Sequence, residues 1–197
     1  MTVLILARHG RTSWNDEGRY QGQSDVPLNE HGLRQARFLA EQLRSEPLSA
    51  VYSSDLRRSY DTARAIARRH RLSVHADPRF REINQGRWDG LLHREILTMD
   101  GPLAQAWTEH PLSVRPPGGE SLRAVHERVV AATAEALAQY AGGVVCVVTH
   151  KVTMVVLRSA ITGEDLERRL RTLPANAAFE KLDLPNDPPW FAIERLA

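Results

Sequence analysis

Cysteine, long apolar runs and an excess of one charge sign are all scarce in this chain of 197 residues. The single cysteine, Cys146, excludes an internal disulfide and is typical of a reducing compartment, so we expect a cytoplasmic protein. No apolar run approaches the roughly 18–20 residues of a membrane span, and no signal-peptide pattern is visible, so we expect no membrane partner. The formal net charge is only +2, so we expect no nucleic-acid partner.

Strand-like runs alternate with helical periodicity along the chain, which predicts an α/β fold with a mostly parallel sheet. The expected strands span residues 2–8, 50–53, 144–148, 176–184 and 190–196. The expected helices span residues 31–45, 55–70, 121–140 and 152–162, with Asn29 as the N-cap of the first.

The stretch from about 77 to 119 differs from the rest, because it is proline-rich and shows only short helical patterns. We interpret it as a lid-like excursion that caps the sheet edge within a single domain spanning residues 1–197. Long excursions of this kind often line active sites.

Polar side chains stand where three of the predicted strands end. Arg8 and His9 end the first, Arg58 lies shortly after the second, and His150 follows the strand at 144–148. Ligands bind at the carboxyl ends of strands in open α/β sheets, so these groups are expected to meet if the strands are adjacent. Arginine forks match phosphate oxygens, and a helix N-terminus adds N–H donors, so the pattern predicts an anion site.

Phosphoryl chemistry fits these residues better than a metal does, because the arginines would repel a metal ion and no H-x-x-x-H pair or cysteine cluster is present. Cys146 is not a suitable nucleophile, since it lies within an apolar strand and Val152 stands where a cysteine phosphatase needs arginine. Neither a D-x-D loop nor a phosphate-binding G-x-x-x-x-G-K-[ST] loop is visible. A neutral imidazole remains as the nucleophile, and His9 beside Arg8 is best placed.

Attack on a phosphoester also needs an acid to protonate the leaving alkoxide, which is worth about 10²–10⁴-fold in rate. Glu82 is the candidate, because it lies early in the excursion, where a lid would shield it from water. The alternative is a surface ion pair between Glu82 and Arg81 or Arg79.

Taken in their order along the chain, the motifs resemble those of the histidine phosphatase superfamily, also called the phosphoglycerate mutase-like family. They look most like the phosphatase branch of that superfamily. The resemblance runs from residue 8 to about residue 153. It rests on Arg8–Thr12 with Trp14–Asn15, Gly18–Gly22, Pro27–Asn29, Ser53–Arg58 with Thr62–Ala63, Glu82 with Gly86, Trp88 and Gly90, Pro117–Ser121, and Thr149–His150.

The resemblance implies a three-layer α/β/α sandwich without metal or organic cofactor. It implies that His9 takes the phosphoryl group and that Glu82 acts first as acid and then as base. Arg8, Arg58 and His150 would hold the phosphoryl group. The residues that it places on the phosphate or substrate side are Gly10, Asn15, Gln21 and Gly22.

Lys151 departs from the family pattern, in which glycine usually follows the second histidine. One hypothesis is that it adds a cation at the pocket rim and favours acidic phosphoesters. The other is that its flexible stem points to water.

The expected activity is hydrolysis of small phosphorylated metabolites, and a phosphoglycerate mutase using the same phosphohistidine is the alternative. The mutases are typically longer, and the Ser54–Leu56 segment looks more like the phosphatase branch, which favours a phosphatase. A non-catalytic phospho-ligand binder is a third reading, but such a protein would lack the nucleophile or the acid, and His9 and Glu82 are both present. A homodimer is compatible with the sequence, which does not determine the oligomeric state.

Overall fold

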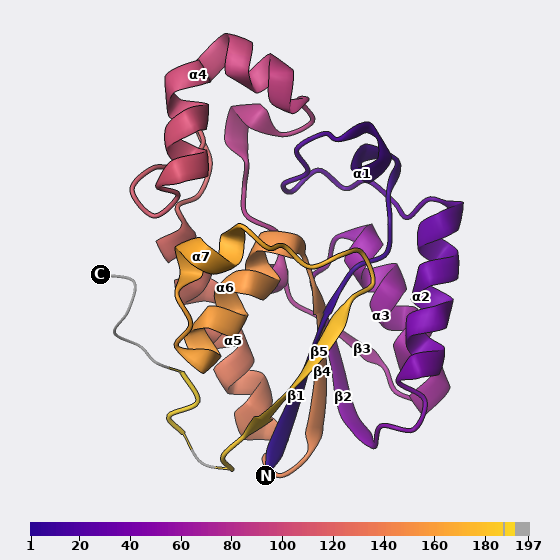
Figure 1. The fold of residues 1–197 in the computed structure, drawn as a ribbon. Coiled ribbons are helices and arrows are strands. Elements are labelled where there is room, and N and C mark those ends of the chain that lie inside the picture. The colour runs from indigo at the N-terminus through magenta and orange to yellow at the C-terminus, as the bar shows by residue number, and fades with distance from the viewer. Residues whose placement is uncertain (187, 192–197) are drawn as a thin grey trace.

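The computed structural model describes residues 1–186 and 188–191, which form a five-stranded sheet flanked by helices (Figure 1). The sheet has the strand order β3-β2-β4-β1-β5, and all neighbours are parallel except the antiparallel pair β1–β5. The predicted α/β class and mostly parallel sheet are confirmed. The strands are β1 (Thr2–Arg8), β2 (Leu48–Ser53), β3 (Val74–Ala76), β4 (Val144–Thr149) and β5 (Phe179–Leu184).

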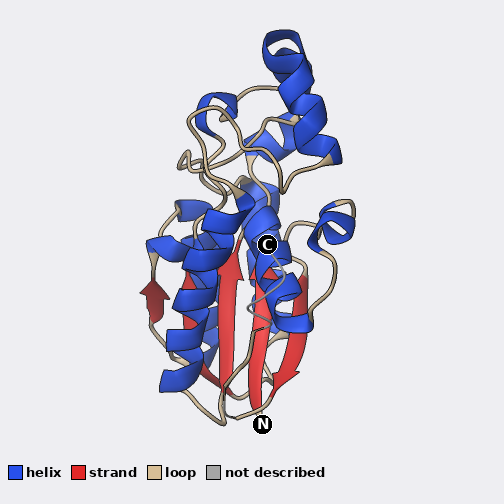
Figure 2. Cartoon of the chain, turned by 90° about the vertical axis from the view of Figure 1, so that its left-hand side faces the viewer, coloured by secondary structure: helices blue, strands red, loops and turns tan. Residues whose placement is uncertain are grey.

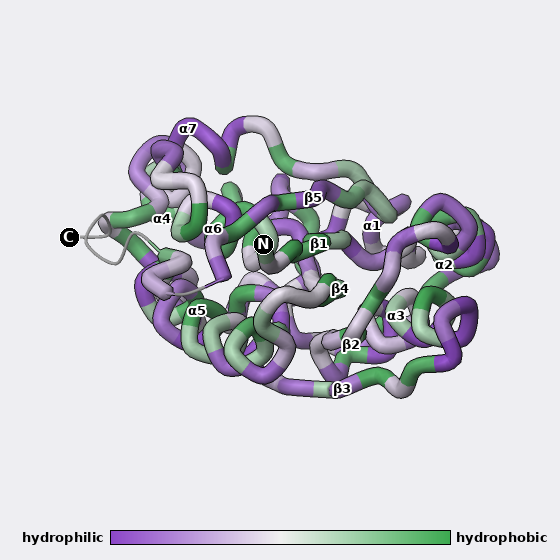
Figure 3. Tube along the Cα trace, turned by 90° about the horizontal axis from the view of Figure 1, so that it is seen from below, coloured by the Kyte–Doolittle hydropathy of each residue, from purple (hydrophilic) through white to green (hydrophobic). Residues whose placement is uncertain are grey.

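Helices cover both faces of the sheet, which gives the three layers of the predicted sandwich (Figure 3). On one face α2 (Glu30–Gln42) and α3 (Arg57–His70) pack against β1, β2 and β4. On the other face α5 (Leu122–Gln139) and α6 (Lys151–Thr162) form a second apolar cluster, to which the short α7 (Leu166–Leu170) contributes. The central strands are buried on both sides, as their unbroken apolar runs predict.

The helices follow the apolar spacing of the sequence closely. In α2 the buried face consists of Gly32, Ala36, Leu39 and Ala40, three and four residues apart. The predicted N-cap is confirmed, because the Asn29 side chain accepts a hydrogen bond from the backbone N–H of Gly32.

The end of the chain departs from the prediction. The strand predicted at 176–184 begins only at Phe179. Of the strand predicted at 190–196, residues 190–191 are not in a strand and residues 192–196 lie outside the described residues. The short elements α1 (Ser13–Glu17), β3 and α7 were not predicted.

The excursion at 77–119 holds α4 (His93–Glu109), in which two short helical segments join at a kink, as the expected short helical patterns predict. The helix is kinked at Asp100, where the backbone leaves helical geometry, and Pro102 follows inside it. Trp88 Nε1 donates to the Asp100 carboxylate at 2.8 Å, which ties the kink to a buried side chain. With the short α1 (Ser13–Glu17), α4 stands beyond the edge at which the parallel strands end (Figures 1 and 2).

Across residues 1–186 and 188–191, none of the helices has the length and apolar character that crossing a bilayer requires.

Candidate active site

Strand pairing places the two candidate histidines side by side. Arg8 and Thr149 are register partners in β1 and β4, and the His9 N–H donates to the Thr149 carbonyl at 3.0 Å. His9 and His150 are therefore the first residues beyond two adjacent parallel strands, and their ring centroids lie 5.1 Å apart. The expectation that these two strand ends meet is correct.

One nitrogen of the His9 ring is tethered and the other is free. Nδ1 lies 2.6 Å from the Gly10 carbonyl oxygen, which can only accept, so Nδ1 carries the proton. Nε2 then holds the lone pair, and within the described residues it has no hydrogen-bond partner. The His9 ring lines a cavity of about 510 Å³, so this tautomer offers a nucleophilic nitrogen to whatever enters.

His150 is fully buried next to His9 and is positioned by β2. Its Nε2 lies 2.7 Å from Ser54 Oγ, at the carboxyl end of that strand. Its Nδ1 is buried and has no partner in the described part of the chain. Because buried polar groups are nearly always satisfied, this nitrogen is available to a bound ligand.

Two buried guanidinium groups flank the histidines. Arg8 donates Nη1 to the Pro174 carbonyl at 2.6 Å, and Arg58 donates to the carbonyls of Gly22 and Ser24 at 2.7 Å each. In both arginines Nε is buried without a partner among the described residues. Burial lowers the pKa of each to about 10, so both remain cationic at neutral pH.

The electrostatics keep both histidines neutral. Burial is the main cause that lowers the His9 pKa well below its ordinary value, and Arg58 and Arg8 lower it further. Burial and Arg58 act on the His150 pKa in the same direction. A neutral imidazole keeps its lone pair, so the cationic surroundings preserve His9 as a nucleophile while leaving room for an anion.

The Glu82 carboxylate faces the same cavity and is held by the start of α6. Oε1 accepts from the N–H of Ile83, the N–H of Thr153 and the Thr153 hydroxyl, at 3.0–3.1 Å. Oε2 accepts from the Val152 N–H alone, at 3.1 Å. Helix N-termini favour carboxylates, so α6 fixes the position of Glu82, and Oε2 is the oxygen left with room for a proton. The alternative surface pairing with Arg79 or Arg81 is wrong, since Glu82 is only 4% exposed.

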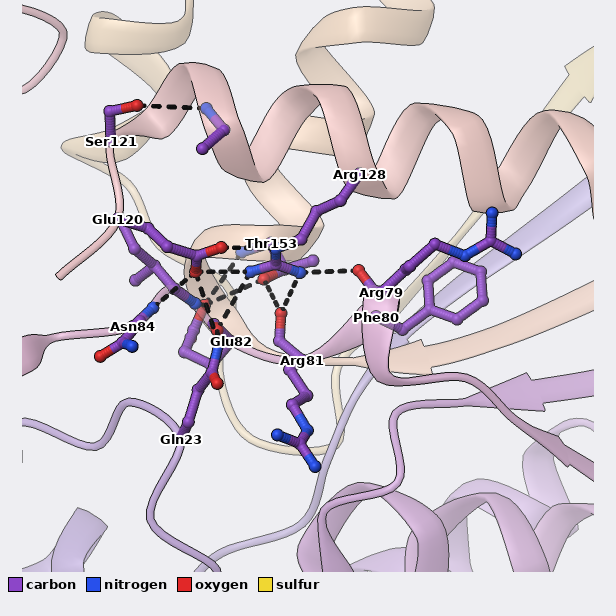
Figure 4. A network of polar contacts seen from close by, with 12 residues as sticks. Gln23, Arg79, Phe80, Arg81, Glu82, Asn84, Glu120, Ser121, Arg128 and Thr153 are labelled. Carbon is purple, nitrogen blue, oxygen red and sulfur yellow. Dashed lines mark hydrogen bonds and ion pairs between the residues drawn. The ribbon is translucent and has the colours of Figure 1, made fainter.

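A partly buried ion pair anchors the backbone that carries Glu82 (Figure 4). Arg128 on α5 donates to the carbonyls of Arg79 and Arg81 at 2.6 and 2.7 Å, and to the Glu82 carbonyl at 3.1 Å. Its guanidinium also pairs with Glu120 at 2.9 Å. The entry to the excursion is therefore tied to α5 behind the site.

Three of the five predicted substrate-side residues, Asn15, Gln21 and Lys151, line the cavity with Arg8, His9 and Glu82. Gln21 Oε1 accepts from the Asn15 amide at 3.4 Å, and Gln21 Nε2 is buried without a partner in the described residues. These amides are further donors that an anion in the cavity can use.

Gly10 and Gly22 are not among the residues that line the cavity, so their place on the substrate side stays a prediction. Each accepts a hydrogen bond from a residue of the proposed site through its carbonyl. The Gly10 carbonyl holds His9, and a Cβ on Gly10 would lie 2.5 Å from the Gly32 carbonyl oxygen, so only glycine fits. The Gly22 carbonyl accepts from Arg58. Arg58 and His150 are also absent from the cavity lining and lie buried beside His9.

Sequence reasoning missed the residues that support this site. Ser54 and Thr153 were within the quoted motifs or beside them, but nothing assigned them as partners of His150 and Glu82. Asn176, which donates to the Asn15 side chain at 3.0 Å and lies 3.3 Å from the His9 carbonyl, had no signal in the sequence. The excursion contributes Trp107, which lines the cavity from α4.

Two other kinds of site are poorly supported by the described part of the chain. No group of three or more histidine, cysteine, aspartate or glutamate side chains is placed to hold a metal ion there. Cys146 is fully buried, and burial raises the pKa of its thiol to about 12, so it is not a thiolate at neutral pH.

Residues 4–193 match the family profile of the histidine phosphatase superfamily (branch 1). The chain belongs to this superfamily. It is 40% identical to phosphoserine phosphatase 1 of Hydrogenobacter thermophilus, over 85% of this chain and 80% of the relative. It is 35% identical to a probable phosphoglycerate mutase of Yersinia pestis, over 98% of this chain and 89% of the relative.

A solved structure of a mycobacterial glucosyl-3-phosphoglycerate phosphatase aligns with a TM-score of 0.84 at 33% identity, covering 91% of this chain and 88% of that one. The resemblance inferred from the ordered motifs is therefore confirmed at the level of the superfamily and of the fold.

Proposed function

We propose that this chain hydrolyses phosphomonoesters of small metabolites, with His9 as the phosphoryl acceptor. The observation that carries the proposal is the free His9 Nε2 with unsatisfied buried nitrogens beside it, namely the Nε donors of Arg8 and Arg58 and Nδ1 of His150, which donates to a ligand when Ser54 donates to Nε2. A phosphoryl group with three oxygens would satisfy such donors. The names of the relatives, a phosphoserine phosphatase among them, support this substrate class.

In the first step, His9 Nε2 attacks phosphorus and the bond from phosphorus to the ester oxygen breaks. Glu82, protonated on Oε2, gives its proton to the leaving oxygen, so the alcohol departs neutral. Arg8, Arg58 and His150 stabilise the charge of the transferring group, which is where most of the catalysis of phosphoryl transfer arises.

In the second step, the Glu82 carboxylate takes a proton from water as the water oxygen attacks the phosphohistidine. The bond between Nε2 and phosphorus breaks, inorganic phosphate leaves, and His9 and Glu82 return to their starting states. The same glutamate serves as acid and base, because it gives up a proton in the first step and takes one back in the second.

The test is hydrolysis of 4-nitrophenyl phosphate by the purified full chain after treatment with excess chelator. We expect metal-independent turnover, because the charge of the phosphoryl group is neutralised by fixed arginines. Loss of activity on chelation that returns on adding a divalent cation would contradict the mechanism.

A phosphoglycerate mutase is the second candidate, and it is favoured by the 35% identical relative of that name. The two activities differ in whether water or a second substrate hydroxyl accepts the phosphoryl group. With 3-phosphoglycerate as the substrate, we expect inorganic phosphate to form faster than the isomer 2-phosphoglycerate. Phosphate release and NMR of the products measure the two rates. Faster formation of 2-phosphoglycerate than of inorganic phosphate would show that the chain is a mutase. If no phosphoester gave either product, the chain would be a binding protein without catalytic activity.

A further inference from the structure

Lysine is rare in this chain, and one of its two lysines lies in the catalytic cavity. Lys151 is the first residue of α6 and lines the cavity with Arg8, His9 and Glu82. The other, Lys181 on β5, pairs with Glu46 at 2.8 Å on the surface. All other basic side chains except the histidines are arginines. A lysine in the cavity is therefore unusual for this chain.

The Lys151 ammonium is partly buried and, within residues 1–186 and 188–191, has neither a hydrogen-bond acceptor nor an ion-pair partner. Burial lowers its pKa and the charge of Arg8 lowers it further, while the charge of Glu82 acts in the opposite direction. Removing an ammonium group from water without pairing it costs free energy. An anion bound in the cavity would pair with the Lys151 ammonium and offset this desolvation cost.

The phosphoryl group does not need this cation. Nε of Arg8, Nε of Arg58 and Nδ1 of His150 are already buried beside His9 without a partner among the described residues. Lys151 directly precedes Val152, whose N–H holds Oε2 of Glu82, the oxygen assigned to protonate the leaving group. The residue that carries the ammonium is thus next in sequence to the one that holds the leaving-group acid, and the proposed mechanism places the alcohol part of the ester beside that acid.

We propose that Lys151 binds a carboxylate on the alcohol part of the substrate, so that this chain selects phosphomonoesters of hydroxy acids. The inference rests on the proposed function for the assignment of the leaving-group side. It replaces the hypothesis that the lysine stem points to water.

The surrounding charges favour one carboxylate over a second phosphate. Arg19, which also lines the cavity, is already paired with Glu17 at 2.6 Å and with the Gly90 carbonyl. Arg171 is an exposed lining residue, and the carboxylates of Glu109 and Glu167, also in the lining, would repel a second dianion more strongly than a single carboxylate. A single partly buried ammonium matches a single negative charge.

The decisive experiment measures binding without turnover. Calorimetry compares 3-phosphonopropionate with n-propylphosphonate, which differ by a carboxylate in place of a methyl group, on the wild-type chain and on Lys151→Met. We expect the wild type to bind the carboxylate compound about 10- to 100-fold more tightly, as a charge-assisted hydrogen bond would give. In Lys151→Met this ratio should fall to within about twofold, with propylphosphonate affinity almost unchanged. Lys181→Met is the matched control and should keep the wild-type ratio.

Three results would overturn the inference: an unchanged ratio in Lys151→Met, an equal loss of affinity for both compounds, or no binding of either by the wild type. Tighter binding of 1,3-propylenebisphosphonate than of 3-phosphonopropionate would overturn the choice of carboxylate. Turnover of 3-phosphoglycerate and of glycerol 3-phosphate, compared as kcat/KM, separates this inference from the proposed function. If the phosphonate ratio behaves as expected and neither ester is hydrolysed, the proposed function fails and the carboxylate site stands.

Discussion

Replacing His9 with asparagine is expected to lower kcat for every phosphomonoester by at least about 10⁴-fold, because the nucleophile is lost. Asparagine is a sharper choice than alanine, since its side-chain N–H can take the place of Nδ1 on the Gly10 carbonyl while Nε2 disappears. Steady-state hydrolysis of 4-nitrophenyl phosphate measures the effect.

Two controls separate lost chemistry from lost structure. His31→Ala removes an exposed histidine of α2 and should keep full activity. His9→Asn should still bind inorganic phosphate, because Arg8, Arg58 and His150 remain. Activity in His9→Asn within tenfold of the wild type would assign the nucleophile elsewhere.

Glu82→Gln is expected to reduce kcat/KM for alkyl phosphates by about 10²–10⁴-fold, the usual worth of a general acid. For 4-nitrophenyl phosphate the loss in kcat/KM should be far smaller, because nitrophenolate leaves readily without a proton. The comparison isolates the first step, since kcat/KM reports events up to the first irreversible one.

The matched control is Glu167→Gln, which changes another carboxylate of the same cavity. It should affect both classes of ester equally and weakly. Equal large losses for alkyl and nitrophenyl esters in Glu82→Gln would show that Glu82 holds α6 in place and does not donate the proton. The amide keeps an acceptor for Thr153, which limits that structural effect.

The sequence predicted the central part of the site because the chemistry stands next to strong periodic signals. An apolar run ending in Arg8 and His9 identifies both the strand and its catalytic end, and the same logic applies to β4 and His150. The carboxyl ends of parallel strands share one edge, so adjacency of β1 and β4 was enough to bring the two rings to 5.1 Å.

The remaining features depend on contacts that local patterns do not encode. The kink of α4 at Asp100 is tied to Trp88, which lies 12 residues away along the chain. The position of Glu82 depends on the N–H groups of α6, and Asn176 reaches the site from the far end of the chain. The contacts of Gly10 and Gly22 with His9 and Arg58 were not predicted either, because a motif marks a place in the site without saying which neighbour each residue contacts.

A covalent phosphoryl group on His9 is the central claim of the proposed mechanism. The wild-type chain is mixed with phosphoester, quenched within milliseconds into alkali, and digested for mass spectrometry. We predict one phosphoryl group on His9, stable in alkali and lost in acid, and absent from His9→Asn. A phosphoryl group on another residue, or hydrolysis by the wild type with no phosphoenzyme at any quench time, would contradict the central claim.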